Sequence, residues 1–272
     1  MSGWVTGKWN AARALATITQ HFANWKEVWA AYRSGTAPPP LLTRGGTKLG
    51  SLPGCDSISL FWEIWRDRCY TSRGFYQPQP TDTVLDLGAN QGFFALFLCE
   101  RVPGIRVHCF EPAAETRAQL LRNIESNGLG RTVSVYPFAI SDRYTEATFH
   151  VTANSEHGSL FESQFSGSNA QKVECIPLSR AIELTQAGEI DLLKIDVEGA
   201  EIEILEGAAP EIWPRIHRVV VEYHDLFRPG CRDRVEVALR NAGYQVKVIP
   251  MPGNPLLGTI EATRATNGSF RK

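Results

Sequence analysis

Residues 83–98, TVLDLGANQGFFALFL, contain the pattern that decides the fold. Apolar and β-branched residues surround an acidic residue, Asp86, a glycine-containing turn follows, and a second apolar run begins after it. This order predicts a short buried strand, a tight turn and a helix. Gly88 and Gly92 permit the turn and let the backbone approach a ligand, because glycine has no Cβ. A carboxylate beside such a turn raises the question of what it binds.

The alternation of strand and helix continues through the rest of the chain, which is typical of βαβ units. The predicted strands are 83–87, 105–110, 132–137, 190–196, 217–223, 244–249 and 257–262. The predicted helices are 92–101, 113–127, 178–187, 200–209 and 231–242. We therefore expect an α/β fold with a doubly wound, mostly parallel sheet.

Residues 138–177 are too many for a simple connection between two elements of that sheet. They contain two strand-like pieces, EATFHVT and QKVECIPL, around a polar stretch that contains glycine. We expect an inserted hairpin or flap at the functional edge of the sheet, since long loops in compact domains are usually functional or disordered.

Residues 1–75 have a different sequence pattern, without the alternation of strands and helices. Aromatic residues recur at helical spacing over 4–34, and three consecutive prolines then end the helix. The segment DSISLFWEIWRDRCY predicts another helix, with Asp56 or Ser57 as its cap. We expect 1–75 to form an N-terminal helical appendage or lid, and 76–272 to form the main domain. These helices also offer a surface for a homo-oligomer.

The composition argues against several classes of protein. The chain has 272 residues, a formal net charge of -1 and no long basic run, which disfavours a nucleic-acid partner. Its six cysteines form no Cys-x-x-Cys pair, so we expect reduced thiols in a cytoplasmic protein. The first residues lack the pattern of a signal peptide and any long apolar span, so no membrane partner is expected.

Polar residues follow most of the predicted parallel strands, at the end of the sheet where open α/β folds bind ligands. They are Asp86, Glu111, Ser141, Asp142, Asp196, Glu222 and His224. Glu111 lies where a second-strand carboxylate accepts hydrogen bonds from ribose hydroxyls. The dinucleotide fingerprint requires glycines at 88, 90 and 93, but Asn90 and Phe93 stand at two of these positions. The pattern therefore favours an adenosine-containing ligand other than NAD.

Four segments resemble the successive motifs of the FkbM family of S-adenosylmethionine-dependent O-methyltransferases: VLDLGANQGFFA, CFEPAAETRAQLLRNIESNGL, PFAISD and LLKIDVEGAEIEILEGA. The resemblance implies a class I methyltransferase (Rossmann-like) fold, with seven strands of which the last is antiparallel. It implies S-adenosylmethionine (AdoMet) as methyl donor and a small-molecule hydroxyl, of a sugar or secondary metabolite, as acceptor. Ser179 and Arg180 depart from the family pattern, which often has an acidic pair there.

The resemblance also implies positions for the cofactor. Asp86, Gly88, Asn90 and Gly92 would surround its methionine part, Glu111 would hold the ribose, and residues 139–142 would lie by the adenine. The full set of cofactor residues that we expect is Asp86, Gly88, Ala89, Asn90, Gly92, Phe93, Glu111, Pro112, Ala139, Ile140, Ser141, Asp142 and Asp196.

Methyl transfer from a sulfonium is an in-line displacement, which gains from positioning and from a base that takes the acceptor's proton. The catalytic candidates are Asp196, Glu198, Glu222 and His224, together with Lys194, which is either catalytic or an ion-pair partner of Glu222. His224 is the preferred base because its unperturbed pKa is about 6.5. For the acceptor we expect contacts from Tyr70 and Phe75 near the entrance and from His157 in the flap.

Other interpretations stay open on the sequence alone. Asp196, Glu222 and His224 could hold a divalent metal ion, although the same side chains serve as plain hydrogen-bond partners, and we expect no metal. An NAD-dependent oxidoreductase or epimerase would share the first βαβ unit. A non-catalytic AdoMet-binding scaffold would share the cofactor site. The acceptor molecule and the hydroxyl that is methylated are not specified by any motif.

Overall fold

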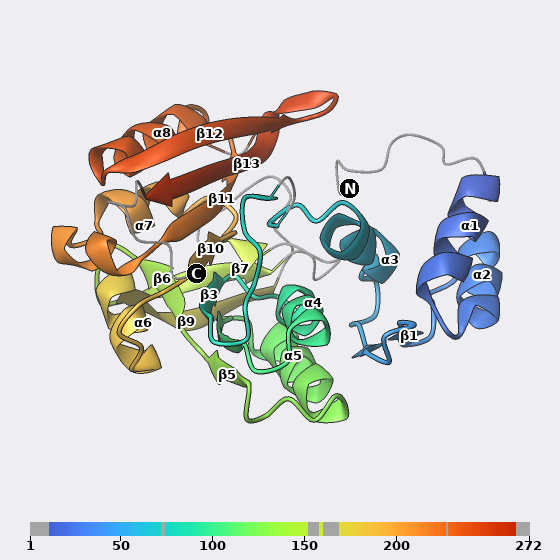
Figure 1. The fold of residues 1–272 in the computed structure, drawn as a ribbon. Coiled ribbons are helices and arrows are strands. Elements are labelled where there is room, and N and C mark those ends of the chain that lie inside the picture. The colour runs from blue at the N-terminus through green and yellow to red at the C-terminus, as the bar shows by residue number, and fades with distance from the viewer. Residues whose placement is uncertain (1–10, 72–73, 152–157, 160–168, 227, 265–272) are drawn as a thin grey trace.

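The computed structural model describes residues 11–71, 74–151, 158–159, 169–226 and 228–264. Its central sheet has seven strands in the order β12-β13-β11-β10-β3-β4-β5 (Figure 1). They are β3 (Thr83–Leu87), β4 (Arg106–Phe110), β5 (Val133–Tyr136), β10 (Leu192–Ile195), β11 (Arg218–His224), β12 (Tyr244–Met251) and β13 (Asn254–Arg264). Neighbours from β5 to β11 pair in parallel, whereas β13 is antiparallel to both β11 and β12. The predicted sheet is confirmed, including its antiparallel last strand.

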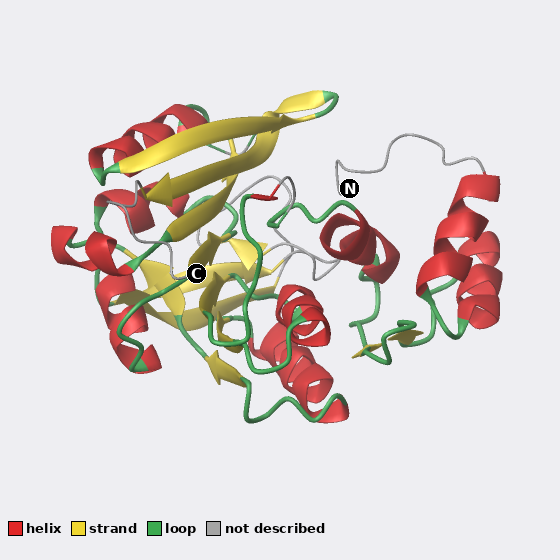
Figure 2. Ribbon diagram, in the orientation of Figure 1, coloured by secondary structure: helices red, strands yellow, loops and turns green. Residues whose placement is uncertain are grey.

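Helices cover both faces of this sheet (Figure 2), which is why β3 is buried at all five positions. One face carries α4 (Phe93–Arg101) and α5 (Ala114–Ser126). The other carries α6 (Leu178–Thr185), α7 (Glu201–Glu206), α8 (Cys231–Asn241) and the 3-10 helix η3 (Pro210–Arg215). All five predicted helices are present, with boundaries displaced by no more than a few residues.

The N-terminal elements are α1 (Ala11–His21), α2 (Trp25–Ser34), the short strands β1 (Leu41–Leu42) and β2 (Lys48–Leu49), α3 (Ser57–Phe61) and a π-helical turn, η1 (Trp62–Arg66). Asp56 caps α3, as predicted: its side chain accepts a hydrogen bond from the Ser59 amide at 3.1 Å. The Trp65 ring meets Phe97 of α4 edge-on, with centroids 5.3 Å apart. Residues of α1, α2, α3 and η1 therefore share one hydrophobic core with α4 and α5. The division at residue 75 stays a prediction.

The predicted insertion contains a second sheet, of four strands in the order β6-β9-β7-β8. These are β6 (Ala139–Ser141), β7 (Thr145–Val151), β8 (Gly158–Ser159) and β9 (Asn169–Pro177). The antiparallel pair β7–β9 corresponds to the two strand-like pieces of the sequence. The parallel pairing of β6 with β9 was not predicted. His157 lies outside the described residues.

The structure also bears on the expectations for the cysteines and for membrane-spanning helices. All six cysteines are free thiols. Among the residues that the structure describes, no helix combines the length and apolar character needed to cross a membrane.

Candidate active site

The turn between β3 and α4 is held by backbone contacts. The amides of Gly88 and Ala89 both donate to the carbonyl of Phe110, at 3.0 and 3.1 Å. Gly88 has φ +76°, and a Cβ there would lie 1.8 Å from the carbonyl oxygen of Asp196. Glycine is required at 88 because the end of β10 approaches this backbone. The close approach of the backbone after β10 therefore explains the glycine at position 88 before any ligand is considered.

Glu111 follows β4 and is bonded to the backbone on both oxygens. Its Oε2 accepts from the Asn90 amide and its Oε1 from the Ala113 amide, each at 2.9 Å. Asn90 adopts the left-handed conformation, φ 51°, which presents its N–H to Glu111. Burial raises the pKa of Glu111 to about 7, although both amides favour its ionised form. Each oxygen keeps a second acceptor position, so this carboxylate suits the two hydroxyls of a ribose.

Asp86 and Lys194 form a buried ion pair between β3 and β10. Lys194 Nζ lies 3.0 Å from Asp86 Oδ1 and donates to the Gly88 carbonyl at 2.9 Å. Asp86 has no exposed surface, and burial raises its pKa while the lysine charge opposes that rise. The charges of Asp86 and Asp196 outweigh burial and raise the pKa of Lys194. Lys194 therefore pairs with Asp86 rather than with Glu222, the partner that the sequence suggested.

Tyr70 joins two of the predicted catalytic carboxylates. Its hydroxyl lies 3.0 Å from Asp196 Oδ2 and 3.0 Å from Glu222 Oε2. One hydroxyl proton can serve only one carboxylate at a time, so the second contact needs a proton on a carboxyl group. Burial, followed by the charge of Asp196, raises the pKa of Glu222 to about 7. The site can therefore hold a proton between Tyr70 and Glu222 near neutral pH.

His224 lies between two other carboxylates. Its Nδ1 is 2.9 Å from Glu201 Oε1, and its Nε2 is 3.3 Å from Glu198 Oε2. Burial lowers the pKa of His224, but the charges of Glu198 and Glu201 together raise it well above its ordinary value. Neither ring nitrogen is a free proton acceptor in this arrangement. The geometry therefore favours Asp196 or Glu222 over His224 as the base.

Several predicted residues do not join this cluster. Phe93 is almost fully buried and packs edge-on against Trp65, so it belongs to the core. Ala139 and Ile140 are also buried, and Asp142 lies beside Gly207 after α7, where it accepts from the Ser141 hydroxyl at 3.1 Å. Pro112 uses its carbonyl to accept a hydrogen bond from Arg117. None of these contacts tests the cofactor roles, which stay predictions.

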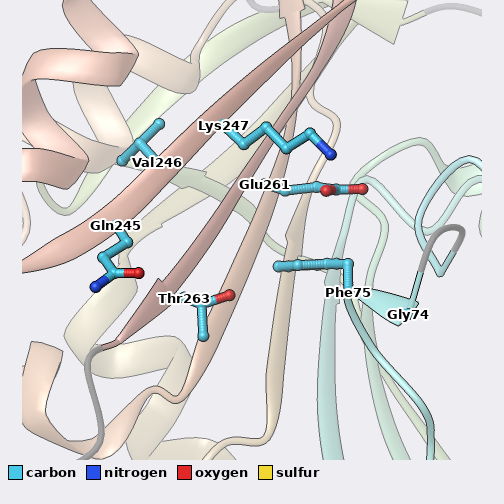
Figure 3. Close-up of a pocket in the computed structure, with 7 residues that line it drawn as sticks. All are labelled: Gly74, Phe75, Gln245, Val246, Lys247, Glu261 and Thr263. Carbon is cyan, nitrogen blue, oxygen red and sulfur yellow. The ribbon is translucent and has the colours of Figure 1, made fainter.

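Phe75 is placed differently from the predicted acceptor entrance. It lines a pocket with Gly74 and with residues of β12 and β13, among them Lys247, Glu261 and Thr263 (Figure 3). None of the residues that line this pocket belongs to the Tyr70, Asp196 and Glu222 group. The structure brings Tyr70 to the site and leaves Phe75 on the sheet beside β12 and β13.

One residue of the cluster is not among the catalytic residues predicted from the sequence. Glu201 is fully buried in the first turn of α7 and also accepts from the Gly199 amide at 3.0 Å. The available signal was that Glu201 stands between the apolar residues Ala200 and Ile202, since a charged group held in a core needs a partner.

The strand order, the single antiparallel strand and the polar cluster at the carboxyl ends of β3, β4, β10 and β11 define a class I methyltransferase fold. The family described as the methyltransferase FkbM domain matches residues 86–246, more than half of the chain. The chain belongs to the FkbM methyltransferase family.

Three relatives illustrate the range of this similarity. The 31-O-demethyl-FK506 methyltransferase FkbM of Streptomyces tacrolimicus is 33% identical over 216 residues, which cover 69% of this chain and 81% of the relative. The 2-O-methyltransferase NoeI of Sinorhizobium fredii is 28% identical, over 54% of this chain and 65% of NoeI. The hexuronic acid methyltransferase AglP of Haloferax volcanii is 23% identical, over 76% of this chain and 84% of AglP.

A solved structure agrees on the fold. The crystal structure of methyltransferase FkbM from Methylobacillus flagellatus superposes with a TM-score of 0.53 at 15% sequence identity. The match covers 92% of this chain but 58% of that one, so the chain spans less than two thirds of the solved protein. At this identity the likeness concerns the fold.

Proposed function

We propose that this methyltransferase transfers the methyl group of AdoMet to a hydroxyl of a small molecule, a sugar moiety or a secondary metabolite. The names of the relatives support this class of acceptor, since they include an O-methyltransferase of FK506, a 2-O-methyltransferase and a hexuronic acid methyltransferase. The observation that carries the proposal is the pair of carboxylates, Asp196 and Glu222, that meet at the Tyr70 hydroxyl.

The residues present fit the cofactor. Glu111 keeps two free acceptor positions for the ribose hydroxyls. The turn from Gly88 to Gly92 follows β3, which pairs with β4 and ends beside Glu111. When bound, AdoMet supplies a methyl group on a positively charged sulfur. The ionised carboxylates of this edge attract such a cation. Asp86 acts here through Lys194, which it holds against the Gly88 carbonyl.

The acceptor hydroxyl would bind at the Tyr70, Asp196 and Glu222 group. Tyr70 can donate to the acceptor oxygen or hold one carboxylate in place, while the other carboxylate accepts the acceptor's proton. The reaction is an in-line displacement, so fixing the acceptor oxygen is a large part of the catalysis. The Tyr70 ring is itself fixed edge-on against Phe94 of α4, with centroids 5.1 Å apart.

Incubation of the chain with deuteromethyl-labelled AdoMet and a panel of uronic acids, oligosaccharides and macrolides tests this proposal. We expect one labelled methyl group on a hydroxyl, read by mass spectrometry and NMR. Methylation of an amine or a carbon alone would overturn the O-methyl assignment. AdoMet binding without turnover on any acceptor would favour a scaffold module, and stabilisation by NAD but not AdoMet in a thermal-shift assay would overturn the cofactor assignment.

Assembly is a separate proposal. A homo-oligomer formed through α1 and α2 predicts a mass of at least two chains in light scattering, and a single-chain mass at micromolar concentration would contradict it.

A further inference from the structure

Carboxylates gather around Asp196. Among the described residues, those of Asp86, Glu198, Glu201 and Glu222 belong to this cluster, together with the ammonium of Lys194 and the imidazole of His224. Glu201, Asp86 and His224 are buried, and the Glu198 side chain is only 14% exposed. Ionised carboxylates in such surroundings are costly unless cations or protons accompany them, so a cluster of this kind favours a bound cation.

Three of these residues converge as ligands of one ion would. Asp196 follows β10, Glu198 lies in the turn after it and His224 ends β11, and one ligand atom from each lies within 4.8 Å of the other two. Glu198 reaches this position because its backbone is left-handed, φ 56°. Glu222, which the sequence suggested as a ligand with Asp196 and His224, is not part of this group, and its Oε2 accepts from the Tyr70 hydroxyl.

Glu201 supplies an independent feature. It lies on α7, has no exposed surface, and accepts from both the Gly199 amide and Nδ1 of His224. A carboxylate on Nδ1 holds a proton there and fixes the orientation of the ring, so Nε2, which faces Glu198 at 3.3 Å, is the nitrogen that a metal ion would bind in place of a proton. Metal-bound histidines are commonly oriented by a carboxylate in this way.

We propose that Asp196, Glu198 and His224 bind a divalent transition-metal ion such as Mn²⁺, and that Glu201 orients the imidazole. Two carboxylates and one imidazole suit such an ion better than Mg²⁺, which prefers oxygen ligands and keeps several waters. Three protein ligands leave coordination positions open for water or a ligand oxygen. Polarisation of the acceptor hydroxyl by this ion rests on the proposed function, whereas ion binding itself does not.

Mn²⁺ titration of the chelator-treated full-length chain, read by the loss of the free-ion EPR signal, tests the site without AdoMet or acceptor. We expect one Mn²⁺ per chain. E198Q should weaken binding at least about tenfold, and E201Q, at the residue that holds Nδ1 of the histidine, about 10- to 100-fold. E206Q is the matched control: Glu206 lies on the same helix and pairs with exposed Arg234, so its affinity should equal that of the unaltered chain.

No binding at Mn²⁺ concentrations on the order of 1 mM would overturn the proposal, because even weak protein sites for divalent ions are occupied there. Equal affinities for E198Q and E206Q, with both variants folded by circular dichroism, would also overturn it and assign a proton to the His224–Glu198 contact. Mn²⁺ binding with methyl transfer unchanged by chelation would support the ion site and separate it from catalysis. The EPR titration does not depend on methyl transfer, so its result stands even if no acceptor is methylated.

Discussion

The hydroxyl of Tyr70 lies 3.0 Å from a carboxylate oxygen of Glu222, a residue 152 positions later in the chain. The same hydroxyl is equally close to Asp196. The segment that follows η1 therefore reaches the carboxyl ends of β10 and β11, and it completes a polar group that the sheet alone does not contain. Among the described N-terminal residues, Tyr70 is therefore one that connects directly to the proposed chemistry.

Tyr70→Phe should lower kcat about 10- to 100-fold, because a hydrogen bond to a charged group contributes about 1.5–3 kcal/mol. The ring contact with Phe94 is kept, so the fold and AdoMet affinity should change little. Steady-state kinetics and calorimetric titration with AdoMet measure the two effects separately. Tyr32→Phe is the control, since that ring packs on Trp29 and Trp62 away from the carboxylates. Equal kcat values for the two variants would remove Tyr70 from the acceptor site.

AdoMet affinity should rise as the pH increases from about 6 to 8. The pKa of Glu111 is raised to about 7 by burial, and the ionised form is the one that accepts two ribose hydroxyls. AdoMet binding therefore favours the ionised form of Glu111. At a pH below this pKa, binding must release the proton of the Glu111 carboxyl group. Calorimetry in two buffers of different ionisation enthalpy detects that proton. Glu111→Gln should bind about 10- to 100-fold more weakly and lose the pH dependence; a pH slope that survives in this variant would assign the effect to another group.

The sequence predicts the central sheet well because its strands are short runs of buried apolar residues between recognisable helices. It also predicts which strand ends carry polar groups, since parallel strands present their carboxyl ends at one edge. The four-stranded insertion is harder to predict: β6 pairs with β9 in parallel across more than thirty intervening residues, and no local pattern specifies such a pairing.

Contacts between the polar residues depend on register and backbone conformation. Lys194 is directly opposite Asp86 in the pairing of β10 with β3, which decides its partner, but alternation along one strand leaves register between strands undefined. The His224–Glu201 contact depends on the left-handed backbone at Glu198 and on Gly199, with φ 119°. Only the glycine is visible in the sequence as a residue that tolerates such a conformation.

Gly88→Ala should destabilise the fold more than an alanine at another left-handed glycine. A positive φ costs an alanine about 1–2 kcal/mol wherever it occurs. At Gly88 the new Cβ would also lie 1.8 Å from the Asp196 carbonyl oxygen, which adds about 1–3 kcal/mol for displacing backbone. Gly54→Ala, at φ +83° with no atom within 4 Å of the new Cβ, provides the conformational term alone. Urea unfolding gives both free energies, and equal losses would contradict the packing explanation.

Lys194→Met should lower the free energy of unfolding by about 3–5 kcal/mol, because it leaves the fully buried Asp86 without its cation. The double variant Asp86→Asn/Lys194→Met removes both charges and should recover most of that loss. A recovery of this kind distinguishes the charge from the packing of the lysine side chain, since the methionine is present in both variants. Urea denaturation of the two variants and of Asp86→Asn alone completes the cycle. If the double variant is as unstable as the sum of the single changes, Lys194 and Asp86 do not act as a pair.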